Sequence, residues 1–420
     1  MRQDEQYELM APAGSYESLM AAIKAGADSV YFGVKGLNMR SGSAYSFTIE
    51  DLGKIAEICR EHGILSYLTV NTVIYDHDME LMRQIIDAAK AAQISAIIAS
   101  DVAAMQYAHQ VGVQVHLSTQ LNISNVEALR FYAQFADVVV LARELNLDQV
   151  EYIHKAILSE PILGPSRRPI RIEMFAHGAL CMAVSGKCYL SLHETNRSAN
   201  RGSCSQVCRR AYRVHDLSSD IELDVENPNI MSPKDLKTIH FINKMIAAGV
   251  RVFKLEGRAR GPEYVYTVVH AYREALNAVA DGSYSDARIA EWDEQLATVF
   301  NRGFWDGYYL GRRLGEWTHS YGSSATRVKV GLGKVVKYYS RLGVAEFVLE
   351  SGELAIGDEI LVSGPTTGAL MQQVEEIRYE LTAVDKAVKG WHISIPVREK
   401  VRAGDRLYKM EVKENGEGKY

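Results

Sequence analysis

Four of the five cysteines of this chain lie within one short segment. Their spacing is Cys181-x6-Cys188-x15-Cys204-x3-Cys208, while Cys59 lies far away in a helical stretch. Four thiolates can hold a tetrahedral zinc ion or an iron–sulfur cluster. Structural zinc prefers cysteine pairs separated by about two to four residues, and only the second pair fits. The spacing therefore favours iron–sulfur over zinc, with two disulfides as the third alternative.

The composition is that of an ordinary soluble globular protein. The chain has 420 residues, of which 47% are hydrophobic and 24% charged. The N-terminal "MRQDEQYELM" lacks the apolar stretch of a signal peptide, and no apolar run approaches the ~20 residues that span a bilayer. We expect a cytoplasmic protein without a membrane partner, whose thiols stay reduced. The net charge of −5 argues against nucleic-acid binding by a broadly basic surface.

Arginine is nevertheless concentrated near the cysteines. The runs are "PSRRPIR" (165–171), "CRRAYR" (208–213) and "EGRAR" (256–260). These arginines are either solvated loop charges or a set of guanidinium groups that bind phosphates or a dicarboxylate through bidentate hydrogen bonds.

Alternating short apolar runs and amphipathic stretches indicate the elements that position these residues. Eight runs predict strands, at 7–13, 29–34, 65–71, 95–100, 113–119, 137–143, 172–178 and 250–257. Eight strands alternating with helices favour a (β/α)8 TIM-like barrel. An open doubly wound sheet is the alternative, but no Gly-rich dinucleotide motif follows the first strand. About seventy residues separate the last two strands, so a Cys-rich insertion follows strand seven.

Barrel enzymes work at the carboxyl ends of their strands. There the sequence places polar and charged residues, which are Arg40, Asn71, Thr119, Gln120, Asn122, Arg143, Glu144, His177, Lys254, Glu256 and Arg258. Strand ends are often polar only because loops are polar. A cavity with several arginines, amides and a histidine, however, suits an anionic substrate with carboxylate or phosphate groups.

A second, all-β part follows the barrel. Helices are predicted over 262–281 and 285–300, and from residue 326 short alternating strands with Gly-Asp turns predict a small β-barrel similar to that of translation factors. We therefore expect a catalytic domain over 1–322, including the Cys-rich segment 178–212. A C-terminal β-barrel domain over 326–411 and a disordered tail over 412–420 complete the division.

The segment "EMFAHGALCMAVSGKCYLS" (173–191) closely resembles the signature of the collagenase-like peptidase family U-32. The match includes Glu173, Phe175, Gly178, Cys181 and Cys188 among others, and "NRGSCSQVC" and "FKLEGR" look like the same family. The length and the terminal β-barrel make the chain most similar to the family's tRNA hydroxylation branch.

This resemblance implies a four-iron–four-sulfur (4Fe-4S) cluster on Cys181, Cys188, Cys204 and Cys208. It also implies oxygen-independent, prephenate-dependent hydroxylation of the tRNA wobble uridine to 5-hydroxyuridine, with a homologous partner subunit in some relatives. Within that scheme we assign catalysis to His177, Glu256 and Arg143. Substrate binding is assigned to the other residues at the strand ends, with Arg40, Arg143 and Arg258 for the dicarboxylate.

Two other functions stay open. A U-32-type, collagenase-like peptidase is one, although the chain has neither an H-E-x-x-H zinc motif nor a G-x-S-x-G nucleophile elbow. A zinc-stabilised accessory protein that binds RNA is the other.

Overall fold

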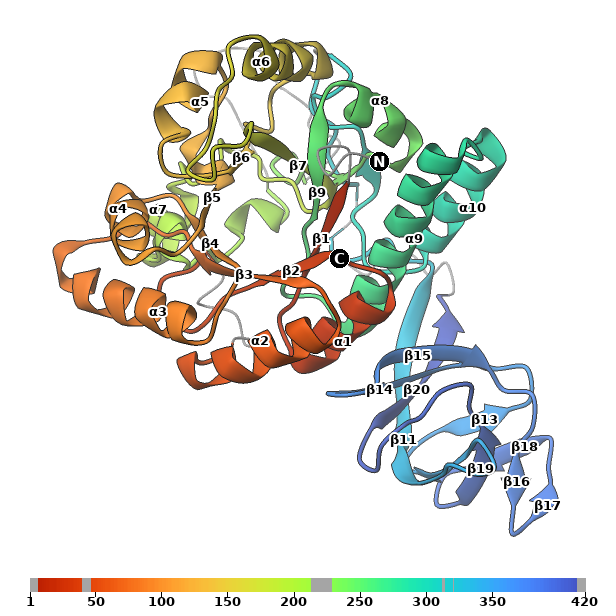
Figure 1. Cartoon of the computed structure of the whole chain (residues 1–420). Coiled ribbons are helices and arrows are strands. Elements are labelled where there is room, and N and C mark those ends of the chain that lie inside the picture. Colours follow the sequence, from red (N-terminus) through yellow and green to blue (C-terminus); the bar gives the residue numbers. More distant parts are fainter. Residues whose placement is uncertain (1–6, 40–46, 213–228, 312–313, 320, 414–420) are drawn as a thin grey trace.

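Eight parallel strands close into a barrel in the first part of the chain. In a computed structural model, which describes residues 7–39, 47–212, 229–311, 314–319 and 321–413, β9 pairs with both β1 and β7 and closes the ring (Figure 1). The strands are β1 (Glu8–Pro12), β2 (Ser29–Phe32), β3 (Leu65–Val70), β4 (Ala96–Ala99), β5 (Val115–Leu117), β6 (Val138–Val140), β7 (Arg171–Gly178) and β9 (Val250–Leu255). The predicted (β/α)8 barrel is confirmed.

Helices surround the strands, as Figure 1 shows. They are α1 (Tyr16–Lys24), α2 (Leu52–Glu61), α3 (Met79–Ala91), α4 (Val102–Val111), α5 (Val126–Tyr132), α6 (Leu147–Ser159), α8 (Ile242–Ala247), α9 (Pro262–Asp281) and α10 (Asp286–Ala297). Side chains of Ser15, Asp101, Asn125 and Asn146 accept hydrogen bonds from the first turns of α1, α4, α5 and α6. Such caps satisfy backbone N–H groups that a helix leaves unpaired.

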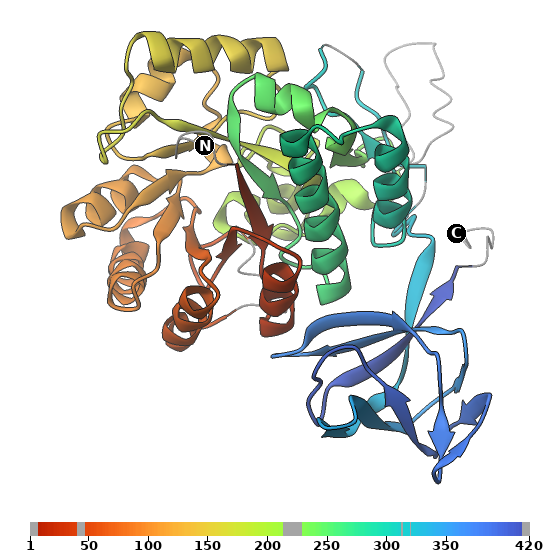
Figure 2. The same ribbon diagram turned by 45° about the vertical axis from the view of Figure 1, so that its right-hand side comes forward.

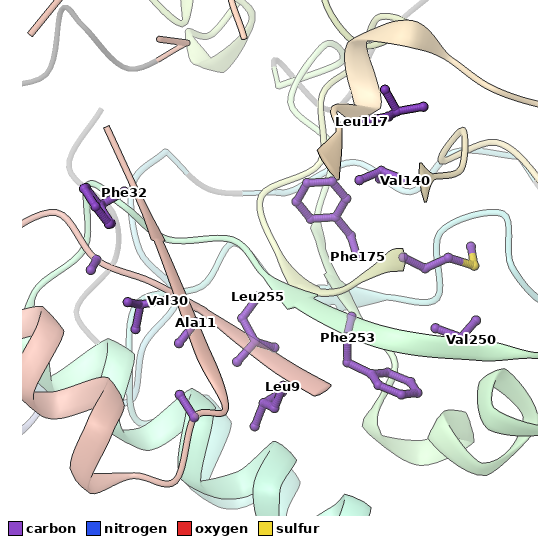
Figure 3. Close-up of a cluster of buried hydrophobic side chains, with 14 of the residues drawn as sticks. Leu9, Ala11, Val30, Phe32, Leu117, Val140, Phe175, Val250, Phe253 and Leu255 are labelled. Carbon is purple, nitrogen blue, oxygen red and sulfur yellow. The ribbon is translucent and has the colours of Figure 1, made fainter. Parts of the chain in front are cut away.

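Alternate residues of each strand divide between two apolar cores, because side chains of a strand point to opposite faces. Leu9, Ala11, Val30 and Phe32 belong to the large core between strands and helices (Figure 3). A second, smaller cluster is made by the alternate positions and consists of Met10, Tyr31, Tyr67, Ala96, Ile98, Val138 and Val252. This smaller cluster includes Tyr31 and Tyr67, whose hydroxyl groups lie inside the barrel and can bind other polar groups there.

The insertion after β7 contains a short strand that the sequence did not reveal. β8 (Asp235–Lys237) pairs antiparallel with the end of β7 and parallel with β10 (Phe304–Trp305). The insertion also contains α7 (Leu190–Thr195) and short 3-10 turns, η5 (Ala199–Arg201) and η6 (Val207–Arg209). β8 has the sequence Asp-Leu-Lys, so no apolar run predicted it, whereas the equally short β5 and β6 lie within the longer apolar runs 113–119 and 137–143.

The C-terminal part is an antiparallel β unit that curls around its own core (Figure 2). It contains β11 (Arg327–Tyr339), β12 (Val344–Leu349), β13 (Glu353–Ala355), β14 (Glu359–Gly364), β15 (Gly368–Gln373), β16 (Arg378–Tyr379), β17 (Thr382–Ala383), β18 (Lys386–Val388), β19 (His392–Pro396) and β20 (Arg406–Val412). An eight-stranded sheet runs β15-β14-β20-β11-β12-β19-β16-β17, beside the β13–β18 pair. The predicted all-β C-terminal part of the fold is thus confirmed, and its strands are antiparallel.

The β unit packs directly on the first barrel. Leu361 and Ala369 belong to the large core, and a Cβ on Gly368 would meet the backbone of Ala21 in α1 at 2.8 Å. β20 extends to Val412, into the predicted tail, and residues 414–420 lie outside the described ranges. Within those ranges, no helix combines the length and apolarity needed to cross a membrane.

Candidate functional site

A cavity of about 230 Å³ opens at the carboxyl ends of the barrel strands. Residues from β2, β3, β7 and β9 form its floor, and the insertion after β7 forms part of its wall. All four clustered cysteines line it, together with most of the polar residues predicted at the strand ends. The cavity therefore stands where a barrel enzyme has its active site.

The four cysteines are free thiols. Cys181 and Cys204 are exposed, whereas Cys188 and Cys208 are partly buried. Burial raises the pKa of the Cys208 thiol, the adjacent Arg209 opposes this, and the other three cysteines are near enough to raise it further. The thiols thus share one environment, and the disulfide alternative does not describe this arrangement.

Two contacts seat the loop that carries Cys181 and Cys188. The side-chain amide of Asn122, a residue with φ of 52°, donates to the carbonyl of Ser185 at 3.1 Å. Gly186 adopts φ of 75° and lies so close to Gln120 that an added Cβ would meet Gln120 Cγ at 2.8 Å. The loop after β5 therefore holds the Cys-rich loop in place.

A second anchor joins the insertion to the loop after β3. Arg201 makes a salt bridge with Asp78 and donates to the carbonyl of Val73 at 3.0 Å. The backbone N–H of Val73 in turn donates to the carbonyl of Asn200. Cys204 follows this anchor by a few residues, so its position is fixed from the barrel side.

The thiols do not form a compact site for one ion. In the part of the chain that the structure describes, no three Cys, His, Asp or Glu side chains stand close enough together to hold a metal ion. A structural zinc needs four ligands converging on one tetrahedral centre. The choice between zinc and an iron–sulfur cluster stays a prediction. A four-iron cluster takes one thiolate on each iron, and the donor set matches it in number and chemical type.

Arg143 and Arg258 both line the cavity. Arg143 stacks on Phe175, with 3.7 Å between the guanidinium carbon and the ring centroid, and donates to the Ala179 carbonyl at 3.2 Å. Its buried Nε has no hydrogen-bond partner among the described residues. Arg258 is buried and donates to Thr69 Oγ1 at 2.8 Å. Arg40 lies outside the described residues.

Lys254 forms part of the cavity floor and is paired rather than exposed. Its Nζ donates to Glu173 Oε1 at 2.7 Å, and both side chains are almost fully buried. Burial raises the pKa of Glu173, although the ammonium beside it opposes the change. The second oxygen of Glu173 has no hydrogen-bond partner among the described residues. The pair fixes the position of the Lys254 ammonium group below the cavity.

The predicted amide and hydroxyl residues come together as expected. Asn71 Nδ2 donates to Ser118 Oγ at 3.1 Å and to Gln120 Oε1 at 3.3 Å. Asn71, Thr119 and Gln120 line the cavity, and the buried Thr119 hydroxyl has no partner among the described residues. Asn122 holds the Cys-rich loop and is not in the cavity wall.

Of the predicted acid–base residues, Glu256 reaches the cavity. Tyr31 donates its hydroxyl to Glu256 Oε2 at 2.9 Å, which orients the carboxylate. Glu144 is exposed and lines a separate surface groove beside α5 and α6.

His177 is buried outside the cavity wall. It packs among Tyr264, Tyr272 and Phe304, and burial lowers its pKa to about 3. The register of β7 against β9 shifts between Phe175 and His177, and β8 pairs with the strand end there. These two features turn the histidine away from the position that simple alternation predicted.

The wall nearest β8 holds charged residues that were not assigned to the site. They are Arg209, Asp235, Arg260 and Arg302. Arg209 and Arg260 lie within or beside the arginine runs 208–213 and 256–260, which was a usable signal. Asp235 gave none, because the strand around it, Asp235–Lys237, contains a single apolar residue. The run 165–171 is at the other end of the barrel, where Arg171 pairs with Glu8.

Comparison with known proteins gives the family. A model of peptidase family U32 matches residues 14–319. A Porphyromonas gingivalis (strain W83) protein named Collagenase is 72% identical over 97% of this chain and 99% of its own length. A tRNA hydroxylation protein P1 from Bacillus subtilis is 33% identical over 88% of this chain and 86% of that protein. A 23S rRNA 5-hydroxycytidine synthase from Escherichia coli is 33% identical over 74% of this chain and 46% of that protein.

These similarities correct the predicted reaction. Prephenate-dependent hydroxylation of the tRNA wobble uridine is wrong on this comparison, because the relative at 72% identity is named Collagenase. The relative named for tRNA hydroxylation is similar at only 33%. The resemblance that suggested the reaction rested on motifs that both kinds of relative can share.

The family itself is confirmed by two independent matches. The family model covers well over half of the chain, including the Cys-rich insertion. The alignment to the 72% identical relative runs over 408 residues, so it also includes the C-terminal β unit. The chain belongs to peptidase family U32.

Proposed function

We propose that this chain is a collagenase-like peptidase whose substrate binds in the cavity at the carboxyl ends of the barrel strands. The observation that carries the proposal is the 72% identity to a protein named Collagenase, which extends over nearly the whole of both chains. The cavity supports it, because two carboxylates, hydroxyl and amide groups and several cations line the same space.

In this proposal Glu256 is the general base. Its carboxylate, oriented by Tyr31, takes a proton from a water molecule whose oxygen attacks the carbonyl carbon of the peptide. The C–N bond then breaks, and the leaving amine receives that proton. Arg143 and Thr119, which both line the cavity, stabilise the oxyanion with a guanidinium charge and a hydroxyl group.

We propose further that Cys181, Cys188, Cys204 and Cys208 hold an iron–sulfur cluster. When bound, such a cluster would supply a Lewis-acidic or redox-active iron at the cavity. The support is the number of free thiols on one cavity wall. Lys254 and the nearby arginines would stabilise the thiolates by their charge.

The experiment is a cleavage assay of gelatin and collagen with full-length protein purified anaerobically. Glu256→Gln should lower kcat by about 100-fold or more, the range of general-base catalysis. The matched control is Glu144→Gln, an exposed carboxylate outside this cavity. A wild-type protein that cleaves neither substrate, or a Glu256→Gln variant that cleaves at the wild-type rate, would reject the proposal.

Iron and acid-labile sulfide analysis of the same samples tests the cluster. Cys181→Ala should lose iron and sulfide, while Cys59→Ala, which changes a buried thiol far from the cavity, should keep both. Stoichiometric zinc without sulfide would contradict the cluster.

RNA is a second candidate substrate class. It is favoured by the relatives named for tRNA and rRNA hydroxylation and by the charge of the cavity wall. Among the described lining residues six cations, Arg143, Arg209, Lys254, Arg258, Arg260 and Arg302, stand against two carboxylates, Asp235 and Glu256. Binding of bulk RNA that weakens steeply with salt, in a protein that leaves gelatin intact, would favour RNA over peptide.

A further inference from the structure

Arg209 joins segments of the cavity wall that are far apart in the sequence. It ends the short turn η6, and its side chain is partly buried. Its Nη2 donates to the carbonyl of Leu180, just after β7, at 2.6 Å. Its Nη1 donates to the carbonyl of Pro233 at 2.6 Å and to Ser232 Oγ at 3.1 Å, in the segment that leads into β8. One guanidinium group therefore ties three parts of the wall together.

These hydrogen bonds connect one cysteine of each pair. Leu180 immediately precedes Cys181, and Arg209 immediately follows Cys208. Arg209 is also near enough to both thiols for its charge to interact with theirs. The bond from Arg209 to Leu180 thus holds the segment of Cys208 against that of Cys181.

The remaining two cysteines are connected by a different residue, Ser191. This side chain lies in α7, shortly after Cys188, and is 1% exposed. Its Oγ accepts a hydrogen bond from the backbone N–H of Ser205 at 2.9 Å and donates to Cys204 Sγ at 3.9 Å. Cys204 therefore keeps its connection to the first cysteine pair when Arg209 is changed, whereas Cys208 does not.

An arginine suits this task because its planar group presents five N–H donors in a fixed geometry. The carbonyls of an irregular segment have no strand or helix partner and need donors from side chains. Ordering such a segment costs conformational entropy. Ligands whose positions are fixed before a metal arrives avoid that cost when the metal binds.

We propose that Arg209 is a positioning residue, which holds Cys208 against Cys181 and so orders the second cysteine pair before a metal binds. None of the roles proposed above uses this side chain. In naming a metal as the purpose of the arrangement, the inference rests on the proposed iron–sulfur site. The positions of the thiols can be tested without any metal.

A competing explanation is that Arg209 acts only through its charge. Removal of the charge alone would leave Cys208 with less thiolate, so this cysteine would be alkylated more slowly. Removal of the hydrogen bonds would instead expose the partly buried thiol and speed its alkylation. Arg209→Lys separates the two explanations, because lysine keeps the charge but lacks the planar group of donors.

The test measures the rate at which iodoacetamide modifies each cysteine of the full-length, metal-free protein, by peptide mass spectrometry. Arg209→Lys should raise the rate at Cys208 about tenfold, because local opening there no longer breaks these hydrogen bonds. Arg209→Gln should raise it less, since the lost charge acts in the opposite direction. Arg210→Gln is the matched control and should change nothing, because the adjacent Arg210 is exposed and pairs with Glu194 on the surface.

Two other cysteines show whether the effect is local. The exposed Cys181 should keep its rate, and the buried Cys59 should stay unmodified. Circular dichroism establishes that each variant is folded. If Arg209→Lys is not, Ser232→Ala decides, because it removes one acceptor of Arg209 and keeps the charge. It should raise the rate at Cys208 about threefold or more, as for loss of one hydrogen bond.

The same variants, reconstituted anaerobically with ferrous iron and sulfide, test the purpose of the arrangement. In competition with a chelator, Arg209→Lys should retain iron about 10- to 100-fold less well than the wild type, the range for outer contacts of metal ligands. A wild-type protein that binds no iron would reject the proposed cluster and leave the alkylation rates to decide the role of Arg209. The inference is overturned if Cys208 in folded Arg209→Lys reacts no faster than in the wild type, or if Cys59 becomes reactive by the same factor.

Discussion

Charged residues at the two ends of the barrel have different surroundings. At the amino ends of the strands, Glu8 accepts hydrogen bonds from Ser29, Tyr67 and Arg171 at 2.7–2.8 Å. Glu8 is 5% exposed, and its charge is matched by one arginine. At the carboxyl ends, six cations and two carboxylates of the described residues line an open cavity with four free thiols. The charged residues at one end form a closed, buried network, and those at the other end face a cavity.

From this difference we expect the amino ends to contribute mainly to stability and the carboxyl ends to the proposed binding of substrate. A buried charge with all its partners present contributes to folding only while the set stays complete. The cations and polar groups that line the cavity can gain partners when a ligand binds. Substitutions at the two ends should therefore affect different measurements.

The largest expected effect on stability is that of Glu8→Ala. It removes the acceptor of two buried hydroxyl groups and of Arg171, so the free energy of unfolding should fall by about 2–4 kcal/mol. Glu256→Ala, at the carboxyl ends of the strands, should lower the free energy of unfolding by less than half as much. It should instead abolish the proposed turnover. Urea unfolding of both variants measures the comparison. Equal losses of stability would break the contrast between the ends.

The second-largest expected effect is a loss of stability in acid, caused by His116 at the amino ends of the strands. Burial lowers the pKa of His116 to about 4. The nearby Glu8 carboxylate opposes this change, and the charges of Lys254 and Arg171 add to it. A group whose pKa is lowered by folding contributes stability above its unfolded pKa, near 6.5, and loses it as the pH falls toward 4. The expected loss is about 3 kcal/mol.

His116→Gln removes this titration. Its unfolding free energy should fall less than that of the wild type between pH 7 and pH 4, while the buried His177, whose pKa is also lowered, still contributes in both proteins. If the unfolding free energies of the two proteins change with pH in parallel, protonation of His116 does not contribute to the acid sensitivity of the protein.

Much of this arrangement could be predicted from sequence. The eight barrel strands and the helix over 262–281 have clear periodicity, and the cysteine spacing predicted a thiol cluster at the strand ends. What failed depended on tertiary context. The arginine run 165–171 precedes β7 and so lies at the amino ends, where Arg171 meets Glu8. His177 has the right spacing, but a register shift and β8 bury it.

A smaller effect is expected from the loop between the first two cysteines. Gly186→Ala places a Cβ at 2.8 Å from Gln120 Cγ at a positive φ, whereas Gly282→Ala has a similar φ of 81° with nothing within 4 Å. Both substitutions carry the cost of a left-handed alanine, about 1 kcal/mol. Only Gly186→Ala should also displace the Cys-rich loop and, with the proposed cluster, reduce the iron content of the protein. If both variants bind iron equally, Gln120 moves aside and does not position the loop.

The smallest effect concerns Cys59, the one thiol at neither end. It is 1% exposed in α2, and burial raises its pKa to about 12, so it has almost no thiolate at pH 8. In metal-free native protein, iodoacetamide should modify the exposed Cys181 and Cys204 first and Cys188 and Cys208 more slowly. Cys59 should react only in urea, as peptide mass spectrometry would show. Modification of Cys59 at the rate of Cys181 would contradict its buried position. If iron, when bound, protects all four cavity thiols, these four cysteines and not Cys59 belong to one centre.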